Sequence, residues 1–131
     1  MKRLLLDTHV ALWWLTDDRK LGARARKLIA ANDCSVSVAS FIELRMKVAA
    51  GRLPHDASER VRAALDQNQI QILPLTDDHV AESARFERAH PDMIDRLILA
   101  VAALGRMELL TRDAALPDLA RSAKLAFIVE I

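Results

Sequence analysis

The sequence predicts an α/β domain built around a mostly parallel sheet of about five strands. Five short apolar runs alternate along the chain with longer segments that have the periodicity of helices. The chain has 131 residues, and 52% of them are hydrophobic. A chain of this length buries about two thirds of the surface that it exposes when unfolded. Because no linker, repeat or low-complexity segment divides it, we expect a single domain over residues 1–131.

The first elements follow from an apolar triplet and two helical patterns. Leu4–Leu6 predicts a short buried strand, and Asp7 stands where a helix cap is expected. We expect helices over Thr8–Leu15 and over Leu21–Ala31, of which the second is basic and amphipathic. Cys34–Val38 alternates serine with valine and predicts the second strand.

Two helices and a strand are predicted in the middle of the chain. Ser40–Ala50 is expected to be helical, since Gly51 occupies the position that glycine favours after a helix. Ala57–Gln67 has the spacing of an amphipathic helix. Ile70–Leu73 predicts the third strand, and Pro74 closes it.

The last third of the chain predicts helices and two further strands. Asp77–Ala89 is expected to be a helix with Thr76 as its cap. Met93–Leu104 is apolar on nearly every face, which predicts a central, buried helix. Met107–Thr111 predicts the fourth strand. A short helix and a fifth strand complete the prediction, over Leu116–Ala123 and Ala126–Glu130.

Charge and composition exclude few functions. The net charge is +1, from 19 basic and 18 acidic residues, so any binding to phosphates needs a local patch of positive charge. Cys34 is the only cysteine, which rules out an intramolecular disulfide. The sequence has neither a signal-peptide pattern nor an apolar stretch of membrane-spanning length. We therefore expect a cytoplasmic protein without a membrane association.

Four separate acids stand at or near the starts of predicted helices, and they form the main functional signal. They are Asp7, Glu43, Asp95 and Asp113. Asp7 and Asp113 follow predicted strands directly, and Glu43 follows one by about a helical turn. In open α/β sheets, ligands bind beyond the carboxyl ends of the strands, where such acids can converge. Converged carboxylates repel one another unless a cation joins them, so the pattern predicts a metal site.

A purely structural interpretation remains open for each acid. Asp7 can act only as a helix cap, and Ser40 with Glu43 fits the spacing of a capping box. Asp92 can cap the helix that contains Asp95, an interpretation that we favour over a metal role for Asp92. Cap and ligand roles are compatible, because a helix N-terminus stabilises negative charge.

The kind of ligand indicates the kind of metal. A site made of carboxylate oxygens suits Mg²⁺ or Mn²⁺, and Mg²⁺ keeps several waters, of which one can attack a phosphate. Zinc is a poor alternative, since the four histidines lie singly in the sequence and make no zinc-binding spacing. His9 is expected to be a helix-surface residue.

Four motifs in order along the chain resemble those of the PIN domain, in particular the VapC-type toxins. Residues 7–15, DTHVALWWL, resemble D-T-H-x-x-L-W-W-L. Residues 40–44 with Lys47 and residues 51–53 resemble S-x-W-E-I-x-x-K followed by G-K/R-L. Residues 90–97 and 109–113 resemble H-x-D-P-F-D-R-L and L-x-T-x-D. Ile42 replaces the usual tryptophan, and Met93 and Ile94 replace Pro-Phe, while all four acids are kept.

The resemblance implies a fold and an activity. The implied fold is a three-layer α/β/α domain with the first strand central in the sheet. The implied activity is that of a Mg²⁺- or Mn²⁺-dependent endoribonuclease, the toxin of a type II toxin–antitoxin pair. Its catalytic metal site would consist of Asp7, Glu43, Asp95 and Asp113. The implied partners are the RNA substrate, a cognate antitoxin whose tail covers the groove, and a second copy of the chain.

Other residues near the acids are candidates for contact with the substrate. The hydroxyls of Thr8 and Thr111 could bond a phosphate or a metal-bound water, although backbone bonding near a turn explains them equally well. Lys47, Arg96 and Arg112 could bind phosphate, or they could form local salt bridges with the acids.

Two alternative functions remain open at the level of the sequence. The acids could only cap helices in a catalytically silent PIN-like interaction module. The chain could also be a phosphatase or phospho-acceptor domain, although such enzymes need a second acid beside the nucleophilic aspartate. Asp7 is followed instead by Thr8, His9 and Val10.

Overall fold

The computed structural model describes residues 1–88, 90–113 and 128–130. The predicted helix Leu116–Ala123 lies outside the described residues. So do Ala89, at the end of a predicted helix, and the first two residues of the predicted strand Ala126–Glu130.

The sheet has five strands, and every neighbouring pair is parallel. The strands lie in the order β3-β2-β1-β4-β5, so the first strand is central, as expected. The direction of the strand order reverses between β1 and β4, which makes their carboxyl ends the place where a ligand is expected. The strands span Arg3–Leu6 (β1), Asp33–Ser37 (β2), Gln71–Leu73 (β3), Glu108–Thr111 (β4) and Ile128–Glu130 (β5).

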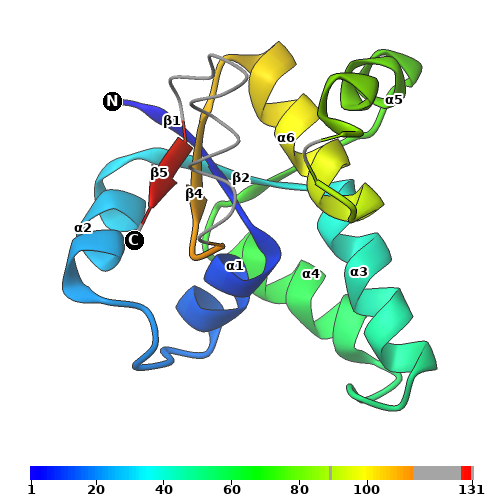
Figure 1. The fold of residues 1–131 in the computed structure, drawn as a ribbon. Helices are drawn as coiled ribbons and strands as arrows, with labels where there is room; N and C mark the ends of the chain where they lie inside the picture. The colour runs from blue at the N-terminus through cyan, green and yellow to red at the C-terminus, as the bar shows by residue number, and fades with distance from the viewer. Residues whose placement is uncertain (89, 114–127, 131) are drawn as a thin grey trace.

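Helices connect the strands and cover both faces of the sheet (Figure 1). A single turn of 3₁₀ helix, η1, follows the fifth α-helix. The helices span Thr8–Leu15 (α1), Ala23–Ala31 (α2), Val38–Ala49 (α3), Ala57–Gln67 (α4), Asp77–Ser83 (α5) and Met93–Gly105 (α6), and η1 spans Ala84–Phe86.

Two separate cores, one on each face of the sheet, confirm the three-layer architecture. Side chains alternate along β1, so Leu5 packs on one face while Leu4 and Leu6 pack on the other. The core around Leu5 is built mainly from α6, with Phe86 of η1. The core around Leu4 and Leu6 is built from α1, α2, α3 and α4. All three leucines are at most 1% exposed, which explains why β1 is an uninterrupted apolar run.

The prediction for the start of α3 was wrong, because Ser37 and not Ser40 caps the helix. Ser37 has extended backbone angles, and its hydroxyl accepts a hydrogen bond from the Ala39 N–H at 3.0 Å. The helix therefore begins at Val38, three residues before the expected capping box would allow. Ser40 lies inside the helix, where its hydroxyl accepts a hydrogen bond from Thr8 Oγ1 at 2.7 Å. Glu43 consequently lies in the second helical turn.

The predicted helix over Asp77–Ala89 is shorter than expected. Its cap is confirmed, since Thr76 and His79 form a reciprocal capping box. The α-helix ends at Ser83, whose hydroxyl donates to the carbonyl of Val80 at 2.6 Å. A side-chain bond of this kind competes with helical bonding, and the chain continues as η1, which buries Phe86 completely.

Helix α6 confirms the prediction of a buried apolar helix. Asp92 caps it, because the Asp92 carboxylate accepts from the backbone N–H groups of Ile94 and Asp95. Residues 97–102 are all buried, while Met93 and Leu104 at the two ends are exposed. In the part of the chain that the structure describes, no helix is long and apolar enough to cross a bilayer.

Candidate metal centre

The four predicted acids come together in one surface hollow of about 440 Å³. They reach it from the end of β1, from α3, from the start of α6 and from the residues after β4. Carboxylates that are far apart in sequence therefore meet near the carboxyl ends of β1 and β4. The lining consists of Asp7, His9, Trp13, Glu43, Asp92, Asp95, Arg112 and Asp113.

Asp7 is both a helix cap and the most deeply buried acid of the site. Only 7% of its surface is exposed. One carboxylate oxygen accepts from the Thr8 N–H at 2.8 Å, and the other accepts from the Thr111 hydroxyl at 2.7 Å. These two bonds fix the plane of the carboxylate at the switch point of the sheet. The cap and the site interpretations thus describe the same side chain.

Burial raises the pKa of the Asp7 carboxyl above its ordinary value. The hydrogen bonds from Thr111 and Thr8 favour the charged form and oppose this rise, while the negative charge of Glu43 adds to it. The ionised form of Asp7 is therefore unfavourable in the metal-free protein, and a bound cation would stabilise it.

Asp95 shows the same effect more clearly. Burial, together with the charges of Asp7, Asp92 and Asp113, raises its pKa to about 7, and His90 partly opposes the rise. A carboxyl with this pKa is close to half protonated at neutral pH in the absence of a metal. Crowded carboxylates of this kind are typical of functional sites.

Glu43 extends from α3 toward the same hollow and carries its own counter-ion. Lys47, one turn further along the helix, lies 3.4 Å from its carboxylate. The Lys47 ammonium also lies 3.3 Å from His9 Nε2, so it bridges the acid on α3 and the imidazole on α1. Lys47 is thus placed at the edge of the acidic site.

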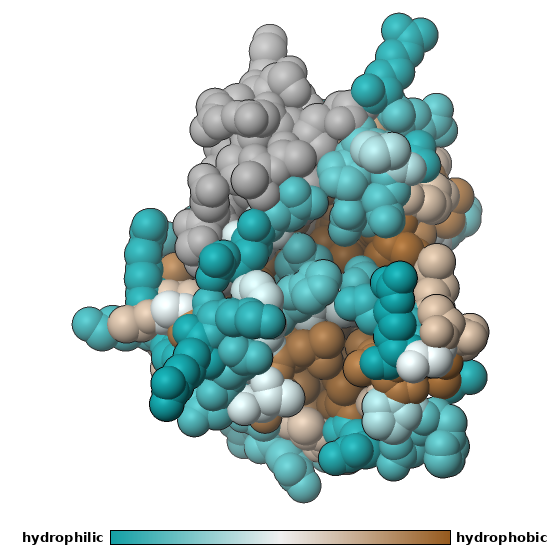
Figure 2. Space-filling view, turned by 60° about the horizontal axis from the view of Figure 1, so that its bottom comes forward, coloured by the Kyte–Doolittle hydropathy of each residue, from teal (hydrophilic) through white to brown (hydrophobic). Residues whose placement is uncertain are grey.

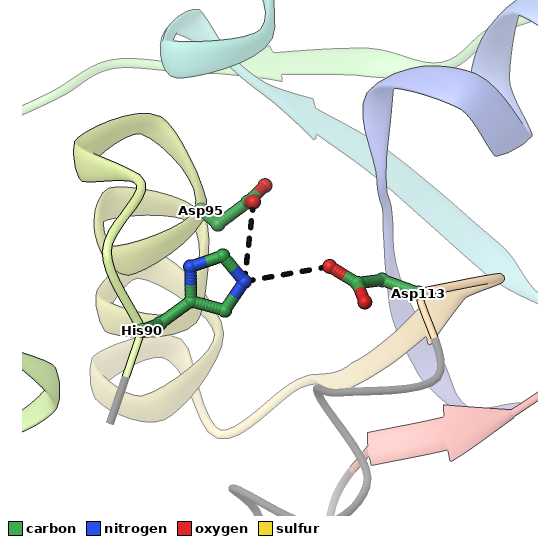
Figure 3. Close-up of side chains that lie close together, drawn as sticks. All are labelled: His90, Asp95 and Asp113. Atoms are coloured by element: carbon green, nitrogen blue, oxygen red, sulfur yellow. Dashed lines mark hydrogen bonds and ion pairs between the residues drawn. The ribbon is translucent and has the colours of Figure 1, made fainter.

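Asp113 completes the group from the loop after β4. Its backbone N–H donates to the Thr111 hydroxyl at 3.0 Å. Because the same hydroxyl donates to Asp7, Thr111 links the two acids across the switch point. The Asp113 carboxylate approaches His90, and so does that of Asp95 (Figure 3).

The donor set fits a hard divalent cation. Carboxylate oxygens dominate the hollow, and they suit Mg²⁺ or Mn²⁺ better than zinc. Carboxylate oxygens of Asp95 and Asp113 lie within 4.8 Å of each other and of a His90 ring nitrogen, close enough for the two carboxylates to share one ion. Burial is the main cause of the raised pKa values of Asp7 and Asp95, and the charges of neighbouring carboxylates add to both rises.

Of the residues proposed to contact the substrate, some line the hollow and others do not. Arg112 lines the hollow, with its guanidinium 5.4 Å from the centre of the Trp13 ring. The hydroxyls of Thr8 and Thr111 instead point inward and orient neighbouring side chains. Arg96 does not line the hollow, and its guanidinium donates to the Pro91 carbonyl at 3.3 Å.

Comparison with protein families decides the class of this fold. Residues 4–122 match the family model of the PIN domain. The chain belongs to the PIN domain family. The range that matches the family model includes all four acids, from Asp7 to Asp113.

Curated and solved proteins resemble this PIN domain along most of its length. The chain is 29% identical over 117 residues to Ribonuclease VapC22 of Mycobacterium tuberculosis, which covers 86% of this chain and 88% of that protein. It matches a chain of a toxin–antitoxin complex from Klebsiella pneumoniae with a TM-score of 0.63 and 24% identity, over 98% and 99% of the two chains. It also matches a chain of VapBC2 from Rickettsia felis, bound to a promoter DNA fragment, with a TM-score of 0.66 and 13% identity, over 98% of each.

The PIN-domain site contains two features that the sequence reasoning missed. His90 was treated as an isolated histidine, yet its buried ring faces two of the acids. His9 was expected at a helix surface and is indeed exposed, but it lines the hollow together with Trp13. The position of both histidines inside acid-containing motifs was the available signal. Asp92 caps α6 as expected and also lines the hollow.

Proposed function

We propose that this protein is a metal-dependent endoribonuclease, the toxin of a type II toxin–antitoxin pair, formed by one PIN domain over residues 1–131. The observation that carries the proposal is the convergence of four carboxylates in one hollow at the switch point of the sheet. The similarity to Ribonuclease VapC22 supports RNA as the substrate.

Asp7, Glu43, Asp95 and Asp113 would hold Mg²⁺ or Mn²⁺. A bound ion of this kind supplies an activated water for attack on the scissile phosphodiester and neutralises charge on the phosphoryl group. The protein holds its acids in place beforehand: Thr111 orients Asp7, and Asp92 caps the helix that carries Asp95. Such fixed positioning limits the reorganisation that is required when the substrate arrives.

Cationic side chains at the rim of the hollow would bind the RNA backbone. Arg112 lines the hollow, and Lys47 lies beside Glu43. An arginine can hold a phosphate through two hydrogen bonds, and a lysine acts as a point charge. Lys47 also pairs with Glu43, and Arg112 also donates to the Lys20 carbonyl, so both side chains would contribute local positive charge while held at the rim.

Replacement of Asp7 by asparagine tests the function directly. Asp7→Asn keeps the shape of the side chain but removes its charge, so we expect Mg²⁺-dependent RNA cleavage to fall by at least about 100-fold. Cleavage of end-labelled RNA by purified protein is measured with Mg²⁺, with Mn²⁺ and with a chelator. Asp33→Asn is the matched control, because Asp33 is an exposed acid at the amino end of β2.

Full metal-dependent cleavage by Asp7→Asn would contradict the proposal. Absence of both cleavage and Mn²⁺ binding in the wild-type protein would favour a silent interaction module. A stable phosphate ester on Asp7 would favour a phospho-acceptor domain. Sequencing of the RNA ends that the wild-type protein produces identifies the sequence that it cuts.

We further propose a cognate antitoxin as the regulatory partner, with an apolar segment seated between α1, α3 and α4. An apolar groove of about 320 Å³ lies there, and it shares α1 and α3 with the acidic hollow. Figure 2, which turns this side of the molecule forward, shows apolar residues recessed between hydrophilic ones. The matched chain from Klebsiella pneumoniae belongs to a toxin–antitoxin complex. The groove is lined by Leu12, Leu15, Thr16, Leu44, Leu53, Pro54, Ala57, Arg60, Val61 and Ala64.

A charged residue in this groove separates antitoxin binding from catalysis. Val61→Arg is expected to weaken binding of the product of the adjoining gene by at least about tenfold, since it places a charge against apolar surface. RNA cleavage should persist. Ala63→Arg is the control, because Ala63 is on the same helix but does not line this groove. Equal binding by both variants, measured by calorimetry with the fold checked by circular dichroism, would place the antitoxin elsewhere.

A homodimer is the remaining partner that we propose. Ile42 and Met46 are one turn apart on α3 and are 39% and 59% exposed. Helix α3 packs against α6, where Met93 is 45% exposed. Large apolar side chains exposed on adjoining helices are typical of a surface that a second copy covers.

A further inference from the structure

His90 is a buried imidazole placed between two carboxylates that arrive from different elements. It is 8% exposed and lies in the turn before α6. Its Nε2 atom is 3.4 Å from Asp95 Oδ2 and 3.4 Å from Asp113 Oδ2 (Figure 3). The contact with Asp113 is a long hydrogen bond and the contact with Asp95 is at ion-pair distance, so the ring lies between the two acids.

A hydrogen bond on the other side of the ring determines which of the two ring nitrogens carries the proton. His90 Nδ1 accepts from the backbone N–H of Asp92 at 3.1 Å. A nitrogen that accepts a hydrogen bond carries no proton, and an imidazole ring has at least one N–H. The ring proton is therefore assigned to Nε2, which points at the two carboxylates.

This tautomer makes His90 a donor toward the acids. An Nε2 that carries a proton has no lone pair to offer a metal ion, so the ring does not ligate in this arrangement. Each carboxylate has two oxygens and about four acceptor positions. A carboxylate that accepts from His90 can therefore still bind a cation.

The surrounding contacts hold the ring in this position. The His90 backbone N–H donates to the Phe86 carbonyl at 3.0 Å, and Arg96 donates to the carbonyl of the next residue, Pro91. The Asp92 carboxylate accepts from the Asp95 N–H at 3.2 Å. The imidazole, the cap of α6 and one of the two acids thus form one connected unit.

We propose that His90 is a positioning residue that holds the Asp95 and Asp113 carboxylates together for a divalent cation without ligating the cation itself. The proposal deepens the proposed function and rests on it, because the cation is the one that RNA cleavage would use. Removal of the donor leaves two carboxylates from separate elements to repel each other. Hydrogen-bonding partners of ligands commonly contribute 10–100-fold to metal affinity.

Four substitutions at this position distinguish the roles of the ring. His90→Gln places an amide N–H near the position of Nε2 and keeps the donor. His90→Asn keeps only an acceptor near the position of Nδ1, and His90→Glu offers a ligand but no donor. His90→Ala removes both functions. Mn²⁺ affinity is measured on each full-length variant by electron paramagnetic resonance, with thermal unfolding as a check of the fold.

We expect His90→Ala, His90→Asn and His90→Glu to weaken Mn²⁺ binding by about 10–100-fold. His90→Gln should retain affinity within about threefold of the wild type. Recovery in His90→Glu but not in His90→Gln would identify His90 as a direct ligand and overturn the proposal. Recovery in His90→Asn would overturn it in another way, because it would assign His90 only to the turn before α6.

Mn²⁺ binding is measured without RNA, so the result does not depend on the proposed activity. If the wild-type protein binds Mn²⁺ and cuts no RNA, the proposed function fails while the role of His90 is still decided by the four variants. If His90→Ala binds Mn²⁺ as tightly as the wild type, the proposal about His90 fails, whatever the activity.

Discussion

At Asp95, burial and the neighbouring carboxylates oppose ionisation, and this links the stability of the protein to pH. Its pKa in the folded protein is about 7, against an ordinary value of 3.8. Between pH 3.8 and about pH 7, Asp95 therefore carries more of its proton in the folded protein than in the unfolded chain. The contribution of Asp95 to stability is present at low pH and is lost as the pH rises toward 7.

We predict that the metal-free protein loses stability between about pH 4 and pH 7 in part through Asp95. Asp95→Asn should flatten this part of the profile and raise the melting temperature at pH 8 by a few degrees, on the order expected for about 1 kcal/mol. Thermal unfolding in the presence of a chelator measures the effect. Mg²⁺ should restore stability to the wild type above pH 7, because it binds the ionised acids of the folded state. A profile for Asp95→Asn as steep as that of the wild type would contradict the prediction.

At the residue scale the sequence predicted which acids meet in the hollow but not which neighbours orient them. Asp7 and Asp113 could be recognised because each follows an apolar strand. The bond from Thr111 to Asp7 joins residues 104 positions apart. Whether the Thr111 hydroxyl turns toward the substrate or toward an acid depends on which strand lies beside β1. That information is absent from any local pattern.

At the scale of elements, α3 shows how side-chain bonds move a boundary that periodicity alone cannot locate. Ser37 and Ser40 both suit a helix cap, and both precede apolar residues. The Ser40 hydroxyl accepts a hydrogen bond from the hydroxyl of Thr8, a residue of α1. Ser37 bonds the backbone two residues ahead and caps α3. The contact between helices that excludes Ser40 forms only when α1 and α3 pack.

The end of α3 was predictable, because it depends on one local conformation. Gly51 has a φ of +75°. Its N–H donates to the Val48 carbonyl at 3.0 Å, and the N–H of Arg52 donates to the Lys47 carbonyl at 2.9 Å. These bonds satisfy the last carbonyls of the helix, in an arrangement that glycine permits without a steric cost.

We predict that Gly51→Ala destabilises the protein by about 1–2 kcal/mol, the cost of a left-handed conformation for a residue with a Cβ. A Cβ at this position would meet no atom within 4 Å, so the cost arises from the backbone and not from a clash. Urea unfolding monitored by circular dichroism measures the loss. Gly51→Asn is the matched variant and should lose less, since asparagine tolerates this conformation. Wild-type stability in Gly51→Ala would show that the turn has another conformation.

At the scale of the whole molecule, the exposed apolar residues on α3 and α6 predict self-association. We expect the protein to be a dimer at tens of micromolar, as measured by light scattering after gel filtration. Replacing Ile42 and Met46 together by glutamate and lysine should produce a monomer, because charges would then enter the interface. Val80→Lys is the control, since Val80 is 52% exposed on α5. A monomeric wild-type protein, or a double variant that remains dimeric, would disprove this assignment.

The resemblance to the PIN domain implied the central position of the first strand. The sequence by itself determined the fold class and predicted the four acids that meet in one hollow. These properties depend on local patterns: an apolar run predicts a buried strand, and a carboxylate after it lies at the carboxyl edge of a parallel sheet. Only the tertiary structure decided that His90 lies between Asp95 and Asp113, that Thr111 links two acids, and that an apolar groove adjoins the site. The reason is physical: these contacts join residues from different elements, and they exist only after the strand order β3-β2-β1-β4-β5 has brought those elements together.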